Sequence, residues 1–184
     1  MRCSQVIIIA LNNLEKAEKI KSMLCMEGYN IVAVCISGND LIRRASIYDE
    51  CLIVIGYNLV DMNINDVYYA LSDNCSFLAI VNESHKSFIE EKTDMYCISS
   101  PINKVVLVNA VDMIFQGQKK VHKLMEKVCG LECKIEERKN IEKAKGFLME
   151  TLGLTENEAF NYIQKSSMKT GLKMNEIAKK IMAS

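Results

Sequence analysis

The 184-residue sequence predicts a flavodoxin-like α/β sandwich, followed by a coiled-coil helix and a small all-α bundle of three helices. Over the first hundred residues, short and continuously apolar segments alternate with amphipathic segments, which is typical of parallel strands covered by helices on both faces. Pro101 is the only proline, and after it apolar residues recur at helical spacing. The C-terminal residues 137–184 show three short helical patterns separated by glycines.

The strand candidates are rich in β-branched residues without polar alternation, so we expect both faces of the sheet to be buried. They are residues 5–11, 31–36, 51–55, 77–81 and 95–98. The helix candidates between and after them are residues 14–27, 39–47, 64–71, 84–91 and 103–115. Repeats of this kind with short connections predict one parallel sheet in the flavodoxin-like strand order, over residues 1–115.

A narrow apolar seam continues beyond the predicted sandwich. From Ile114 onward, apolar residues recur at heptad spacing with charged residues between most of them, which predicts a coiled coil over residues 116–136. The dimerisation residues would be Val121, Leu124, Val128, Leu131 and Ile135. Gly117 and Gly130 weaken the pattern because glycine disfavours helix. The alternative is one long amphipathic helix that folds back on its own domain.

Residues 137–184 predict a compact bundle. Each of its three helices presents one apolar face and is too short to bury that face alone, so the faces should meet. Gly153 and Gly171 are expected to end the first two helices, and Thr155 with Glu158 forms a capping box for the second. The residues expected to face the core are Ile141, Ala144, Leu148, Leu152, Ala159, Ile163, Ser166, Met174, Ile177, Ala178 and Ile181.

Composition excludes two classes of protein. With 49% of its residues apolar, the chain can form a core, which argues against wholesale disorder. It contains no run of about 20 apolar residues, so no transmembrane helix is expected. The N-terminal apolar run is short and lacks a small-residue cleavage site, which argues against a signal peptide. We therefore expect a cytoplasmic protein without membrane contact.

Charge is unevenly distributed, although the formal net charge is zero. Residues 1–115 carry 9 Lys and Arg against 14 Asp and Glu, whereas residues 116–184 carry 14 against 9. A basic C-terminal part can attract a polyanion. The alternative is a solvated helical face without such a partner.

The eight cysteines do not form a metal-site pattern. Most are scattered singly within apolar segments, as expected for buried reduced thiols. Cys129 and Cys133 form the one close pair, without a second pair or a nearby histidine, so ordinary thiols are favoured over a metal site. No nucleophile or cofactor motif is visible, and we expect neither a cofactor nor an enzymatic activity.

Over about residues 4–115 the positions that follow the predicted strands can be compared with a known pattern. They read Asn12 and Asn13 after the first strand, Gly56 at the end of the third, Val81 or Asn82 after the fourth, and Ser100 before Pro101 after the fifth. The order of elements resembles the CheY-like receiver domains of bacterial response regulators. In that family the same positions hold an acidic pair, a phosphoacceptor aspartate, a Thr or Ser, and a lysine before a proline.

These replacements remove every chemical role of a receiver. Two asparagines cannot supply the carboxylate charge that Mg²⁺ requires, and glycine offers no nucleophile. Asp61 and Asp66 lie too far along the chain to replace the phosphoacceptor. The resemblance therefore implies a pseudo-receiver that keeps the fold without phosphotransfer, with Ser100–Pro101 a candidate cis bond. The alternative is an unrelated α/β domain.

The C-terminal helices carry a specific set of residues at fixed spacing. An arginine, an apolar residue and A-K-G-x-L-M are followed by E-A-[FY] and then by E-[VI]-A. The matching residues are Arg138, Ile141, Ala144, Lys145, Gly146, Leu148, Met149, Glu158, Ala159, Phe160, Glu176, Ile177 and Ala178. Over about residues 134–183 this set closely resembles the ANTAR domain, the RNA-binding module of transcription antitermination regulators of the AmiR and NasR type. Ser167 stands where the family usually has alanine.

The resemblance and the helical spacing together predict an RNA-binding surface. Lys145 and Met149 lie one turn apart, as do Lys165 and Lys169 beside Tyr162. The candidate RNA-binding residues are Arg138, Lys143, Lys145, Gly146, Met149, Tyr162, Lys165 and Lys169. For the aromatic residues Phe147, Phe160 and Tyr162 we expect core packing, with base stacking as the alternative for Tyr162.

Gly146 interrupts a helix of otherwise good periodicity, at a cost of roughly 1 kcal/mol relative to alanine. Such a glycine usually allows something to approach the helix closely. The approaching group is either RNA or the backbone of a neighbouring helix, and the sequence leaves both open.

The resemblance implies a homodimeric antiterminator that binds paired stem-loops in nascent leader mRNA and prevents a terminator hairpin from forming. Two bundles at the ends of a coiled coil would bind two hairpins and gain avidity. A regulatory protein or a small ligand would act on the pseudo-receiver. The alternatives are a protein-interaction module that sequesters a partner and a regulator that binds duplex DNA.

Overall fold

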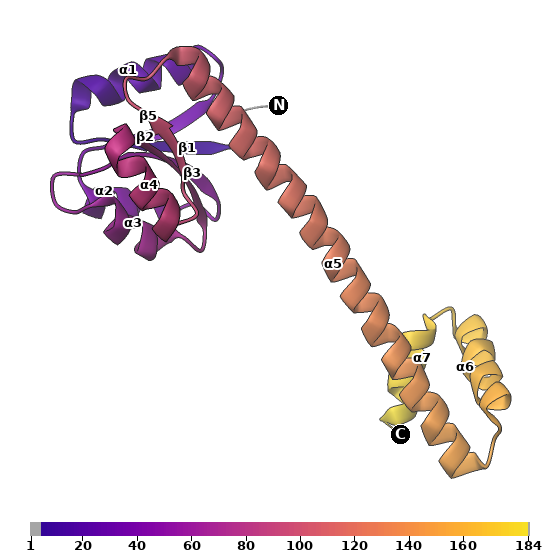
Figure 1. The fold of residues 1–184 in the computed structure, drawn as a ribbon. Helices are drawn as coiled ribbons and strands as arrows, with labels where there is room; N and C mark the ends of the chain where they lie inside the picture. The colour runs from indigo at the N-terminus through magenta and orange to yellow at the C-terminus, as the bar shows by residue number, and fades with distance from the viewer. Residues whose placement is uncertain (1–4, 184) are drawn as a thin grey trace. The chain divides into compact units, whose positions relative to one another are not determined.

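The computed structural model describes residues 5–183, so the outermost ends of the predicted domains, residues 1–4 and 184, lie outside it. Strands and helices alternate up to β5 (Figure 1). These elements are β1 (Val6–Ala10), α1 (Leu14–Cys25), β2 (Asn30–Cys35), α2 (Gly38–Ala45), β3 (Cys51–Gly56), α3 (Ile64–Leu71), β4 (Cys75–Val81), α4 (Glu83–Lys92) and β5 (Tyr96–Ser99). Helices alone follow: α5 (Lys104–Leu152), α6 (Glu156–Thr170) and α7 (Met174–Met182).

The strands form one parallel sheet in the order β2-β1-β3-β4-β5. This order confirms the predicted flavodoxin-like topology. β3 lies at the centre, and each of its residues is buried, as its unbroken apolar sequence predicts. The sheet therefore has helices on both faces.

Two apolar cores form, one on each face of the sheet. Alternate residues of β1 point to opposite faces, so Ile8 joins one core while Ile7 and Ile9 join the other. Residues of α2, α3 and α4 pack on the Ile8 side, and residues of α1 and the first turns of α5 pack on the other side. The carboxyl ends of all strands consequently meet at one edge of the sheet, between the helical layers.

Helix α5 contains 49 residues and is longer than predicted. It joins three segments that the sequence suggested separately: the last helix of the sandwich, the coiled-coil segment and the first helix of the bundle. The chain divides into two compact units within this helix, Met1–Lys119 and Lys120–Ser184, which are called the sheet unit and the helical unit below. A separate dimerisation segment at residues 116–136 stays a prediction.

The core of the helical unit joins the end of α5 to α6 and α7. Its buried residues are Ala144, Leu148, Ala159, Ile163, Ile177 and Ala178. The capping box of Thr155 and Glu158 is present, and Gly171 has the left-handed backbone conformation predicted for a helix end, with φ of +71°.

Two expected core residues lie elsewhere. Leu152 is 59% exposed because it is the last residue of α5, and Leu154, beyond the turn at Gly153, packs on the core instead. Ser166 is only partly buried.

Cys25, in the sheet unit, is exposed, although buried thiols were expected. Within residues 5–183 no helix is long and apolar enough to span a membrane.

Candidate functional site

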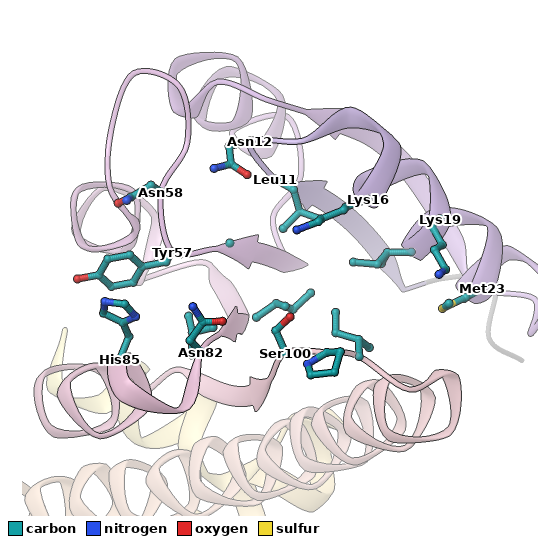
Figure 2. Close-up of a pocket in the computed structure, with 16 residues that line it drawn as sticks. Leu11, Asn12, Lys16, Lys19, Met23, Tyr57, Asn58, Asn82, His85 and Ser100 are labelled. Carbon is teal, nitrogen blue, oxygen red and sulfur yellow. The ribbon is translucent and has the colours of Figure 1, made fainter.

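The carboxyl edge of the sheet holds a cavity of about 580 Å³ (Figure 2). The residues compared above with the functional positions of a receiver all line it: Asn12, Gly56, Val81, Asn82 and Ser100. The structure therefore brings these positions together at one site. The described residues that line the cavity include no aspartate or glutamate, so they offer no carboxylate ligands for Mg²⁺.

Asn13 has a local structural role at this edge. Its side chain accepts a hydrogen bond from the Lys16 amide at 3.0 Å and so caps the N-terminus of α1. Gly56 ends β3 beside Leu11, and a Cβ atom added at Gly56 would lie 3.0 Å from Leu11 Cδ2, closer than ordinary contact. A side chain at this position would therefore require the Leu11 side chain to shift. The Ser100–Pro101 bond is cis, as proposed from the sequence.

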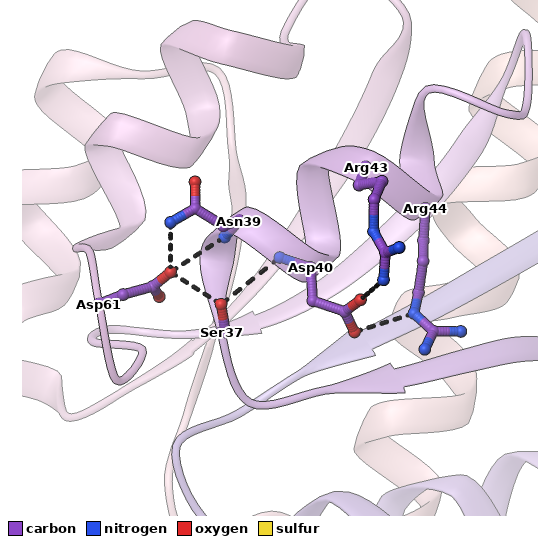
Figure 3. A network of polar contacts seen from close by, with 6 residues as sticks. All are labelled: Ser37, Asn39, Asp40, Arg43, Arg44 and Asp61. Carbon is purple, nitrogen blue, oxygen red and sulfur yellow. Dashed lines mark hydrogen bonds and ion pairs between the residues drawn. The ribbon is translucent and has the colours of Figure 1, made fainter.

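The aspartates after β3 stabilise helix ends. Asp61 accepts hydrogen bonds from Ser37 Oγ at 2.7 Å and from the Asn39 amide at 3.1 Å (Figure 3). It also accepts one from the Gly38 amide at 2.6 Å. These donors at the start of α2 hold the pKa of Asp61 well below its usual range. Asp66 completes a capping box with Asn63 at the start of α3. Both carboxylates thus contribute to the fold, away from the cavity.

Lys145, a predicted RNA contact, is largely buried in the helical unit. Lys145 is only 7% exposed, and its Nζ lies 2.8 Å from Glu142 Oε2 and 2.8 Å from Glu156 Oε1. The two glutamates raise the pKa of Lys145, and Lys145 lowers the pKa of Glu156. The structure therefore places the Lys145 amino group in ion pairs that connect α5 to α6, and an RNA contact by Lys145 stays a prediction.

Gly146 faces away from the core of the helical unit. Each residue turns an α-helix by roughly 100°, so Gly146 lies on the side of α5 opposite Ala144 and Leu148. A Cβ atom added there would have nothing within 4 Å. Packing of α6 or α7 therefore does not require this glycine.

The remaining candidates are exposed side chains. Lys143 and Met149 lie three residues before and after Gly146, on the same side of α5. Tyr162, Lys165 and Lys169 follow one another along one side of α6. The exposed candidates are Arg138, Lys143, Met149, Tyr162, Lys165 and Lys169. Core packing was wrong for the aromatic residues, because Phe147, Phe160 and Tyr162 are 39%, 41% and 49% exposed.

The predicted dimerisation residues form an exposed apolar stripe. Their exposed fractions range from 52% at Val121 to 59% at Leu124 and Leu131. Val128 lies about five helical turns before Gly146, so the stripe and Gly146 are on the same side of α5.

Comparison with known protein families identifies part of the helical unit. Residues 130–182 match the family described as the ANTAR domain. The chain carries an ANTAR domain. The match includes the end of α5 together with α6 and α7.

Curated relatives match both the ANTAR domain and the sheet unit. Two of them, from the CDC 1551 / Oshkosh and ATCC 25618 / H37Rv strains of Mycobacterium tuberculosis, are each described as transcriptional regulatory protein PdtaR. Each is 26% identical to this chain over 171 residues, which is 89% of this chain and 82% of the relative.

Solved structures show the fold of the sheet unit. A CheY-like receiver domain from Methanospirillum hungatei has a TM-score of 0.55 at 15% identity, covering 63% of this chain and 97% of that one. A receiver domain of a Luxo repressor protein from Vibrio parahaemolyticus has a TM-score of 0.54 at 21% identity, covering 66% and 97%. The sheet unit has the receiver fold.

Some polar contacts of the ANTAR domain were missed by sequence reasoning. Asn140 is buried and donates a hydrogen bond from Nδ2 to Asn175 Oδ1 at 2.9 Å, which joins α5 to α7. Ser167, the departure from the family pattern, donates from Oγ to the Leu172 carbonyl at 2.5 Å. Glu142 was visible as an i, i+3 partner of Lys145, whereas nothing in the sequence indicated Glu156.

Proposed function

We propose that this protein is a homodimeric, RNA-binding transcription antiterminator. Its ANTAR domains bind paired stem-loops in nascent leader mRNA and keep a terminator hairpin from forming. The receiver fold regulates this activity without accepting phosphate, and the protein catalyses no reaction. The ANTAR match at residues 130–182 carries the proposal, and the description of the M. tuberculosis relatives as transcriptional regulators supports it.

The surface of the helical unit supports RNA as the partner. Gly146 leaves bare backbone on an exposed side of α5, and Lys143 stands one turn away to meet a phosphate. On α6, Lys165 and Lys169 place further positive charge beside an exposed tyrosine ring that can stack on an unpaired base. Lys145 supports this surface indirectly, because its ion pairs connect the two helices that carry it.

The exposed stripe on α5 supports the homodimer. Five apolar residues that share one side of a helix and are each more than half exposed lose contact with water when a second copy pairs with them. A dimer presents two ANTAR domains to one RNA. If the RNA carries two hairpins at a compatible spacing, the second contact becomes intramolecular and the overall affinity rises.

Gel-shift titration of the full chain tests the proposal with four nucleic acids. They are a leader RNA with two hairpins, the same RNA with one hairpin deleted, the two-hairpin RNA with scrambled loops, and a DNA duplex of equal length. We expect the order of affinity to be two hairpins, then one, then scrambled loops and duplex DNA. Equal affinity for all four would leave only general polyanion binding, and preference for the duplex would favour a DNA-binding regulator. No binding to any of them would favour a protein-interaction module.

A further inference from the structure

The cavity at the carboxyl edge of the sheet has the size and the place of a small-molecule site. Its volume of about 580 Å³ lies within the usual range for ligand pockets, roughly 300–1,000 Å³. It opens where the strands end, which is the edge at which parallel α/β sheets bind ligands. The cavity belongs wholly to the sheet unit, because its lining residues lie between Leu11 and Ile102.

The two formally charged residues among the described lining residues, Lys16 and Lys19, are both basic and reach the cavity from α1. His85 lies on the far side beside Tyr57 (Figure 2). Acidic residues outnumber basic ones 14 to 9 in residues 1–115, yet none of them lines the cavity. The local charge is therefore opposite to that of the surrounding domain and favours an anion.

Several polar groups of the lining have no hydrogen-bond partner within residues 5–183. The side chains of Asn12, Asn82 and Ser100 are in this state, and Asn82 begins α4 without capping it. The amino groups of Lys16 and Lys19 likewise make no ion pair with a described residue. These groups can bind a ligand without first breaking contacts of the fold.

Apolar surface accompanies these polar groups. Ile20 and Met23 of α1 and Ile102 after β5 line the cavity. The rings of Tyr57 and His85 also line it, with their centres 4.2 Å apart and their planes tilted by 30°, and they extend this apolar wall. A bare inorganic ion would leave this apolar part of the cavity in contact with water.

We propose that this cavity binds a small organic anion, a molecule with one carboxylate or phosphate group attached to an apolar or aromatic body. The lysines and the amide groups bind the anionic group, and the apolar wall binds the body. The ligand takes the place of phosphorylation as the input to the receiver fold. Only this regulatory role rests on the proposed function; binding itself does not depend on RNA.

Calorimetry and thermal unfolding of the full chain, without RNA, test the site. The probes are benzoate and phenyl phosphate, with benzamide and phenol as their neutral counterparts and inorganic phosphate as the bare ion. We expect at least one organic anion to bind with a Kd of about a millimolar or tighter and to raise the unfolding temperature. The neutral compounds and inorganic phosphate should bind at least about tenfold more weakly.

Variants locate the binding. Lys16→Gln and Lys19→Gln should each lower the affinity for the anion about two- to fivefold, as expected for exposed ion pairs. Asn82→Asp should lower this affinity more than about tenfold, because the new carboxylate repels the anion. Asp remains a good residue for the start of α4. Lys21→Gln is the matched control: Lys21 is on α1, pairs with Glu18 at 3.1 Å and does not line the cavity.

Three outcomes overturn the inference: neither organic anion binds, the neutral compounds bind equally well, or Asn82→Asp binds the anion as tightly as the parent chain. Stronger binding of benzoate than of phenyl phosphate would assign the natural ligand to carboxylates, and the reverse to phosphate esters. Failure of the RNA titration would leave this result untouched, so the two proposals fail separately.

Discussion

Gly146→Ala adds one methyl group to the exposed side of α5, where it would contact nothing in the chain. Alanine favours the interior of a helix over glycine by roughly 1 kcal/mol. We therefore expect the free energy of unfolding of the helical unit to rise by about that amount. For a unit of this size the increase corresponds to roughly 4–8 °C in Tm.

Gly130→Ala is the matched control for this gain in stability. Gly130 lies in the same helix, and a Cβ atom there also has nothing within 4 Å. Both variants should therefore unfold at a higher temperature, which differential scanning calorimetry measures. Only the variant at Gly146 should change the affinity for RNA, because Gly130 is at the very start of the ANTAR match and outside the proposed surface.

Affinity for the two-hairpin RNA is the decisive measurement. If RNA backbone contacts the bare helix at Gly146, a methyl group overpacks the contact, and overpacking usually costs about 1–3 kcal/mol. The Kd for RNA should then rise about five- to a hundredfold in Gly146→Ala and stay unchanged in Gly130→Ala. Unchanged RNA affinity in both variants, with the expected gain in stability, would refute the reasoning that a partner requires this glycine.

A second copy of the chain is the competing partner at Gly146, because the exposed stripe lies on the same side of α5. Sedimentation of the RNA-free variants separates the two partners. A weaker dimer in Gly146→Ala would assign the glycine to dimerisation, whereas an unchanged dimer with weaker RNA binding assigns it to RNA.

Further predictions concern the seam, the lysines of α6 and the sheet unit. Leu124→Asp combined with Leu131→Asp places charges in the apolar stripe, so sedimentation should show monomers with an intact sheet unit; a persistent dimer would place the contact elsewhere. Lys165→Ala and Lys169→Ala should each flatten the slope of log K against log salt for RNA by roughly one unit or less, and an unchanged slope would remove that lysine from the phosphate contacts. Incubation with acetyl phosphate or beryllofluoride and Mg²⁺ should leave the intact mass and the unfolding temperature unchanged, whereas a covalent phosphate on the sheet unit would contradict the pseudo-receiver. Because the pKa of Asp61 is depressed, its contribution to stability is complete above its unfolded pKa of about 4 and is lost as pH falls further. The free energy of unfolding should therefore depend less steeply on pH in the acid range in Asp61→Asn than in the parent chain. Identical pH dependence in the two proteins would contradict the role of Asp61 as a helix cap.

Periodicity was sufficient to predict the sheet unit. Each predicted strand overlaps an observed strand, because continuous apolar runs such as β3 have no stable arrangement other than burial on both faces. Spacing also predicted that the core of the helical unit includes Ala144 and Leu148. The single helix α5 was harder to predict, because local glycines suggested breaks that the intact helix does not show.

Contacts between distant residues were beyond the reach of local patterns. Lys145 was predicted as an RNA contact, and its ion pair with Glu156 was not foreseen. Glu156 lies beyond the turn between α5 and α6, and only the packing of these helices brings the two residues together. Similarly, Cys51 and Cys75 were expected as isolated thiols, yet the register of β3 and β4 places their Sγ atoms 3.2 Å apart. The sequence predicts which strands pair more readily than which residues face each other.

The helix caps of the sheet unit do not depend on the side chains that line the cavity. Asp61, Asp66 and Asn13 stabilise helix ends, and none of these contacts involves the cavity residues that replace the chemical groups of a receiver. The proposed loss of phosphotransfer would therefore leave these hydrogen bonds intact. Gly146, in contrast, lowers the stability of its helix. No neighbouring group in the described chain requires a glycine there, because a Cβ atom at Gly146 would have nothing within 4 Å. Sequence choices that oppose local stability and serve no internal contact are expected at functional sites. Gly130 also has open space around it in the same helix, so the position of Gly146 within the A-K-G-x-L-M pattern, beside Lys143 and Met149, is what favours a partner at Gly146.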